Sequence, residues 1–246
     1  MKSQERHKLK ENEFARTVAH ARDVMASRQK DIAWAIAVVV ILLAGVGGYM
    51  WYRQSTASRG TDLLATALAI YESPVVPVAA PAPGSPAPVQ QPGTYLTEQA
   101  KLEAALPKFI EAADKYPTTA AGITARYHAA AILASLGRYG EAEQRYQEVV
   151  SKSGTGLYAR TGRLGLAETQ LAQKKYDSAI NIYTEMSRDT TSVIPVDGVL
   201  MQLGRAYVLA GRKEEAARTF TRVTEEFPQS IYFADAKREL ELTKKS

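Results

Sequence analysis

The chain has 246 residues, of which 23% are charged and 46% hydrophobic, and this balance excludes a globally disordered protein. It contains no cysteine, which excludes disulfides, thiolate metal sites, a cysteine nucleophile and a lipoprotein anchor. The net charge is +5, but residues 95–246 hold 21 Lys and Arg against 19 Asp and Glu with the signs interspersed, so no nucleic-acid-binding face is indicated.

Residues 1–31 form a basic tail with 8 Lys and Arg against 5 Asp and Glu. Phe14, Val18, Ala21 and Met25 recur at helical spacing among the charges, a pattern typical of a short amphipathic helix. A solvated tail accounts for the same residues equally well, so both interpretations stay open.

Residues 32–52 predict a transmembrane helix, because 21 consecutive positions carry no charge. At 1.5 Å per residue such a helix measures about 31 Å, close to the thickness of the hydrocarbon core of a bilayer. Trp34 lies near one end and Trp51 near the other, where aromatic rings favour the headgroup level. A buried core helix would need a large surrounding protein, and a cleaved signal peptide would have a shorter apolar stretch. We therefore expect a retained membrane anchor.

The cations around this segment predict its direction. Four lie within about 20 residues before it and two within about 20 residues after it. They are Arg16, Arg22, Arg28 and Lys30 on the first side, and Arg53 and Arg59 on the second. Because the side richer in cations stays in the cytoplasm, we expect a single-pass protein with a cytoplasmic N-terminus. The bulk of the chain would lie on the far side of the membrane, and the lipid bilayer would be one of its partners.

Residues 53–72 predict an amphipathic helix, with Leu64, Ala67, Leu68 and Tyr71 on one face. Residues 73–94 follow as a Pro- and Ala-rich linker that holds 7 of the 11 prolines in the chain. Proline fixes φ and removes a backbone donor, so this stretch excludes a helix or a central strand. It favours an extended spacer in front of the next domain.

Residues 95–246 contain an internal repeat of 37 residues. A small residue, an aromatic residue four positions later and an apolar residue three further on recur in four windows, which is one helix face repeated four times. The small positions are Ala105, Ala142, Ala179 and Ala216, and the aromatic positions are Phe109, Tyr146, Tyr183 and Phe220. A second helix precedes each of the last three windows, around Ala129, Leu166 and Leu203. Whether the first helix and the linker complete the first repeat stays open.

This pattern resembles the tetratricopeptide repeat, which implies an all-α solenoid of helical hairpins after the transmembrane helix. The 37-residue spacing and the segment EEFPQSIYFADAKREL at residues 225–240 are similar to bacterial envelope proteins such as CpoB and BamD. Arg126 and Arg163 depart from the family, which places a bulky apolar residue there. The order of tail, span, helix and repeats resembles the YfgM-like ancillary subunits of the SecYEG translocon. This resemblance implies a bacterial inner membrane, with the repeat domain in the periplasm.

No pattern of catalytic or metal-ligating residues accompanies the repeats. The three histidines, His7, His20 and His128, have no second histidine at metal-ligand spacing, and Gly154 and Gly156 lack the Lys-Ser/Thr of a phosphate-binding loop. We therefore expect no enzyme activity, no cofactor and no metal.

The first helices of such repeats form a concave binding surface. Superposing the periods places seven residues on it, namely Tyr127, Leu164, Glu168, Leu171, Met201, Arg205 and Val208. This surface would be apolar with one acid and one base, which suits an extended or helical apolar segment of a partner protein. The alternative is that some of these residues pack against the helix that ends at Tyr71 or against the linker.

Together these features predict a membrane-anchored periplasmic scaffold that binds proteins as an accessory of protein export. Its partners would be translocon subunits or a periplasmic chaperone. A scaffold for envelope assembly or cell division is the alternative, and a hydrolase with unrecognised carboxylates is a third hypothesis.

Overall fold

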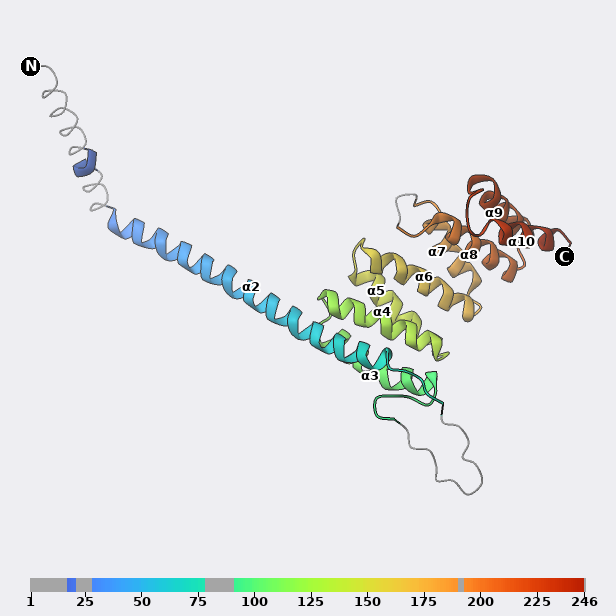
Figure 1. The fold of residues 1–246 in the computed structure, drawn as a ribbon. Coiled ribbons are helices and arrows are strands. Elements are labelled where there is room, and N and C mark those ends of the chain that lie inside the picture. Colours follow the sequence, from blue (N-terminus) through green and yellow to red (C-terminus); the bar gives the residue numbers. More distant parts are fainter. Residues whose placement is uncertain (1–16, 21–27, 78–90, 190–192, 246) are drawn as a thin grey trace, which may run out of the picture. The chain divides into compact units, whose positions relative to one another are not determined.

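The computed structural model describes residues 17–20, 28–77, 91–189 and 193–245. Residues 17–20 are helical, and the rest of the predicted tail helix, including Phe14 and Met25, lies outside the described residues. The longer elements of the described part are all helices (Figure 1). They are α2 (Gln29–Tyr71), α3 (Glu98–Lys115), α4 (Ala120–Ser135), α5 (Tyr139–Lys152), α6 (Leu157–Ala172), α7 (Tyr176–Met186), α8 (Val196–Leu209), α9 (Lys213–Glu226) and α10 (Phe233–Lys245).

The chain divides into two units, Met1–Ser55 and Thr56–Ser246. The first unit contains the apolar part of α2, which is long and apolar enough to cross a membrane, a property that a signal sequence shares. Its large side chains are open to the surroundings: Trp34 is 73% exposed and Ile41 is 69% exposed. None of the apolar window of this helix is buried among the described residues, which favours an anchor or a signal sequence over a buried core helix.

The second unit begins inside α2, and residues 56–71 are the first helix of the first repeat. Ala67 is fully buried there, in one cluster with Phe109 of α3 and Leu133 of α4. The Tyr71 ring meets the Phe109 ring edge-on, with 5.9 Å between the centroids. The question left open by the sequence is thereby answered: this helix and α3 complete a fourth hairpin.

The Pro-rich linker lies within this first hairpin and connects its two helices. Its ends are joined by an isolated parallel bridge between Val75 and Tyr95. The backbone N–H of Val76 donates to the Tyr95 carbonyl at 2.8 Å, and the N–H of Tyr95 donates to the Pro74 carbonyl at 3.0 Å. The linker was predicted to be a spacer between the anchor and the repeats. It instead connects the two helices of the first hairpin, and its two ends lie side by side. Residues 78–90, for which an extended conformation was expected, lie outside the described residues.

The remaining hairpins pair α4 with α5, α6 with α7, and α8 with α9, while α10 packs against α9. The three tight turns inside these hairpins are equivalent, and each places its second residue in the left-handed region. These residues are Gly137 with φ 73°, Lys174 with φ 60° and Gly211 with φ 75°. Glycine adopts this conformation without steric cost, so the repeat that carries Lys174 bears a strained turn.

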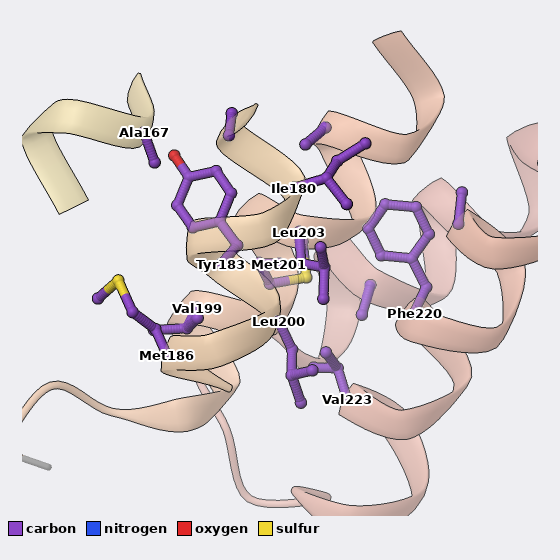
Figure 2. Close-up of a cluster of buried hydrophobic side chains, with 14 residues drawn as sticks. Ala167, Ile180, Tyr183, Met186, Val199, Leu200, Met201, Leu203, Phe220 and Val223 are labelled. Atoms are coloured by element: carbon purple, nitrogen blue, oxygen red, sulfur yellow. The ribbon is translucent and has the colours of Figure 1, made fainter. Parts of the chain in front are cut away.

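The repeated small and aromatic residues form the core, as the register predicted. Ala105, Ala142, Ala179 and Ala216 are all fully buried. The four aromatic residues of the pattern are at most 5% exposed. Figure 2 shows how Tyr183 and Phe220 fill the space between successive hairpins, with Leu200 and Val223 packed beside them. A small residue lets two helices approach, and the ring of the next helix fills the gap that this leaves.

Arg126, which departs from the repeat pattern, is 3% exposed and joins two hairpins. Its guanidinium donates to the carbonyl of Ala113 at 2.8 Å and to that of Pro117 at 3.4 Å, at the C-terminal end of α3. Its Nε lies 2.9 Å from a carboxylate oxygen of Glu148 on α5. The arginine thus satisfies carbonyls that a helix end leaves without partners. Arg163, the second departure, is exposed.

A methyl group added at Gly204 tests the close approach of α8 and α9. A Cβ there would lie 2.4 Å from Cε1 of Phe220, whereas a Cβ at Gly140 of α5 would meet nothing within 4 Å. We expect Gly204→Ala to lower the free energy of unfolding by about 1–3 kcal/mol through overpacking. Gly140→Ala should raise it by about 0.5–1 kcal/mol, because alanine restricts the unfolded chain. Thermal unfolding of the full-length protein in detergent measures both, and equal effects of the two variants would contradict this packing.

Candidate protein-binding groove

The first helices of the repeats carry most of the predicted binding residues on corresponding faces. Leu164, Glu168 and Leu171 are spaced by four and three residues, so they lie along one side of α6. Glu168 and Arg205 occupy the same position in successive repeats, as do Leu171 and Val208, because the period is 37 residues.

Six of the seven predicted residues are accessible. Tyr127, Leu164, Leu171 and Arg205 are partly exposed, and Glu168 and Val208 are exposed. We call these six the groove residues. They fall on α4, α6 and α8, and none of them is buried.

Met201 is the exception and does not belong to an accessible surface. It is 1% exposed and lies in the core cluster with Tyr183 and Phe220 (Figure 2). Its counterparts Tyr127 and Leu164 are only half-buried. An unbranched thioether side chain fills irregular gaps in a core, and Met201 does so between α7, α8 and α9. The expectation that Met201 contacts a partner is therefore corrected.

A pocket with a volume of about 320 Å³ lies where α6 and α8 face the segment after α9. Two groove residues, Leu164 and Glu168, form one wall. The other walls come from Ile194, Pro195, Asp197, Gly198, Val199, Gln202, Ile231 and Tyr232. Helical spacing did not predict Ile194, Ile231 and Tyr232 as part of this surface, because they lie outside the helices and have no place in a helical period. The exposure of Ile231, 86%, is the clearest sign of an unpartnered apolar side chain there.

Aromatic rings extend the groove toward the first repeat. Tyr127 of α4 lies between Tyr146 of α5 and Tyr158 of α6, with ring centroids 6.0 and 5.6 Å away. His128, the next residue, is stacked on Phe109 at 5.0 Å. The ring contacts therefore run from Tyr158 in the third hairpin back to Phe109 in the first.

Glu168 determines the electrostatics of this surface. Partial burial disfavours the charged form, and this desolvation raises the pKa of the Glu168 carboxyl even though the side chain reaches the surface. Burial also raises the pKa of the hydroxyls of Tyr127, Tyr146 and Tyr183, and the charge of Glu168 raises it further. Within the described part of the chain, the Glu168 side chain makes no hydrogen bond and no ion pair.

Two other pockets lie at the turn end of the first repeat and lack groove residues. One of about 430 Å³ is lined by Leu106 and Ile110 with Glu103 and Arg138, and one of about 410 Å³ adjoins Tyr71. No three Asp, Glu or His side chains come together as possible metal ligands among the residues that the structure describes.

Comparison with known proteins gives a family and a fold. The model of a family described as a tetratricopeptide repeat-like domain matches residues 26–231. No curated protein matches the chain. Among solved structures, a putative kinesin light chain from Podosopora anserina with nearly identical TPR-like repeats superposes with a TM-score of 0.53 at 12% identity. That match covers 60% of this chain and 79% of the other. A tetratricopeptide repeat protein from Parabacteroides merdae gives 0.50 at 18% identity, covering 60% of this chain and 56% of its own.

His128 should make stability depend on pH. Burial lowers the pKa of its imidazole below the ordinary 6.5, and the nearby carboxylate of Glu72 opposes this only in part. The unfolded chain therefore takes up this proton first as the pH falls below about 6.5, and stability decreases down to the pKa of the folded state. Thermal unfolding of the full-length protein from pH 7.5 to 5 should show this loss. His128→Gln should reduce it, and His20→Gln, at an exposed site, should leave it unchanged. A His128→Gln profile equal to that of the wild type would contradict the assignment.

Proposed function

The chain belongs to the tetratricopeptide repeat-like domain family, and on this premise we propose that it is a membrane-anchored scaffold that binds segments of other proteins along its first helices. The observation that carries the proposal is the groove itself. Partly exposed apolar side chains and a pocket lie on α6 and α8, while the same helices bury their opposite faces in the core.

Apolar surface of this kind is a binding feature, because a monomeric protein gains by burying it. Leu164 and Leu171 contact the core cluster with one side and leave the other side open. Val208 is 44% exposed, and Ile231 stands at the rim of the pocket. A helical or extended apolar segment would cover these side chains at little conformational cost to the rigid repeats.

Membrane anchoring is supported by the first unit. The apolar part of α2 presents uncovered side chains all round, and a helix that is apolar on every face is suited to lipid. The family match begins at residue 26 and so includes this helix with the repeats. With the cation asymmetry, these features favour a single-pass inner-membrane protein whose repeat domain is periplasmic.

The role that fits these features best is an accessory of protein export. Only residues 53–55 separate the apolar segment from the unit that begins at Thr56, so a short stretch of chain joins the anchor to the repeats. Repeats tethered in this way would meet apolar segments as they leave a translocon, or a periplasmic chaperone that carries them. This combination of short tether and apolar groove supports export more directly than a role distant from the membrane.

The proposed topology is tested by cysteine labelling, since the chain has no cysteine of its own. Gln229→Cys places a thiol at an exposed position after α9, and Val18→Cys places one in the N-terminal tail. A maleimide that crosses the outer but not the inner membrane should label residue 229 in intact cells. The thiol at residue 18 should react only after lysis. Labelling of residue 229 only after lysis would contradict a periplasmic repeat domain.

The groove is tested by a double variant, Leu164→Ser with Val208→Ser. Loss of apolar contacts worth about 2 kcal/mol would weaken partner binding roughly thirtyfold. The measurement is in-cell photocrosslinking from a benzophenone residue at position 234 of α10, followed by mass spectrometry. Val76→Ser with Leu242→Ser, which removes the same side chains at exposed sites outside the groove, is the control. If the groove variant keeps its crosslinks while replacement of residues 32–52 by an unrelated span abolishes them, recognition takes place within the membrane.

A further inference from the structure

The groove pocket contains two carboxylates in different states. Asp197 is engaged: one of its oxygens accepts from the Ser230 hydroxyl at 2.5 Å, and the other accepts from the N–H of Gly198 at 2.9 Å. Glu168 has no such partner among the described residues. Glu168 is therefore the carboxylate of the pocket that stabilises no other described residue through a hydrogen bond or an ion pair.

The surroundings of Glu168 supply oxygens and aromatic rings. Its charge acts on three tyrosine hydroxyls that come from three helices, Tyr127 on α4, Tyr146 on α5 and Tyr183 on α7. The Tyr183 hydroxyl is buried, makes no hydrogen bond within the described part of the chain, and points toward Ala167, the residue before Glu168 (Figure 2). The carboxylate of Glu168 and the hydroxyl of Tyr183 are thus two polar groups that the described residues leave without hydrogen bonds.

No cation among the described residues pairs with Glu168. Arg205, which holds the equivalent position one repeat later, forms no ion pair among them. Of the cations on or directly after α6, Arg160 and Lys175 are paired with Asp189 and Glu143, and Arg163 and Lys174 form no ion pair with Glu168. The carboxylate is therefore available to a cation from a partner.

We infer that the groove selects partner segments in which a lysine or arginine is flanked by apolar residues, with the basic side chain in the pocket and its charge on Glu168. This inference rests on the proposed function of the groove and specifies its partner. A volume of about 320 Å³ corresponds to roughly ten water molecules, which suits one long side chain rather than a length of backbone. Apolar neighbours of the basic residue would contact Leu164, Ile194 and Ile231, which line the same pocket.

The selection follows from the cost of covering an unpaired charge. An apolar segment laid over the groove would remove Glu168 from water without giving it a partner, and such a burial is unfavourable. A segment with a basic residue supplies the missing opposite charge. The groove therefore rejects purely apolar or acidic segments as much as it attracts basic ones.

The test uses full-length protein in nanodiscs and three labelled peptides with the sequence Ser-Leu-Ala-Leu-X-Leu-Ala-Leu-Ser, where X is lysine, norleucine or glutamate. Fluorescence anisotropy should show the lysine peptide binding about tenfold more tightly than the norleucine peptide, since a hydrogen bond to a charged group has that magnitude. Glu168→Gln should reduce this ratio to about one, and Glu168→Lys should reverse the preference toward glutamate. Glu225→Gln, at an exposed carboxylate on α9, should preserve the wild-type ratio.

The outcomes separate this inference from the proposed groove. One outcome is that Leu164→Ser with Val208→Ser weakens the binding of all three peptides while Glu168→Gln leaves the preference for lysine intact. The groove is then the binding site, but Glu168 does not determine the charge preference, and the inference is overturned. If the wild type binds the three peptides equally or binds none, the inference is overturned as well. If lysine is preferred and the leucine and valine substitutions have no effect, binding takes place outside the groove and both ideas fail.

Discussion

The close approach of neighbouring helices at small residues is the constraint on which the rest of this structure depends. Ala130, Ala167 and Gly204 pack against the rings of Tyr146, Tyr183 and Phe220 on the following helix, and a Cβ at Gly204 would lie 2.4 Å from the Phe220 ring. Because this contact recurs every 37 residues, each hairpin takes the same position relative to its neighbour. The accessible faces of α4, α6 and α8 are a consequence of this stacking, since the opposite faces are needed for the core.

The sequence predicted what depends on local period and missed what depends on distant contacts. The register of the small and aromatic residues followed from spacing alone, and burial confirms it. The place of the linker did not, because the hydrogen bonds of Tyr95 with Val76 and Pro74 join residues that are far apart in the chain. Met201 was placed wrongly for a related reason. Equivalent positions in successive repeats lie on the same face of their helices, but whether a side chain there is buried depends on the space that the neighbouring side chains leave unfilled. Arg126 likewise departs from the repeat pattern, and the hydrogen bond from its guanidinium to a carbonyl at the end of α3 explains why an arginine fits there.

The groove likewise combines residues that helical spacing predicts with residues that only the folded structure brings together. Leu164, Glu168 and Leu171 could be found from helical spacing, whereas the pocket walls at Ile194 and Tyr232 come from segments without a period. The state of Glu168 could not be read from sequence at all, because Asp197 in the same pocket is satisfied by Ser230 and Glu168 is not. Two acids of the same charge thus have different roles, one structural and one available.

Because the linker lies within the first hairpin, cleavage of the chain there would separate the two helices of that hairpin. Residues 56–71 belong to the core of the repeat unit, yet they lie on the anchor side of residues 78–90. A single cut in that linker would therefore leave two fragments, of which the N-terminal one carries a helix that completes the other. The burial of Ala67 and the contact of Tyr71 with Phe109 would then hold the pair together as in a split protein. Attachment of the repeats to the N-terminal unit would become a binding equilibrium, set by one helix, instead of a covalent property of the chain.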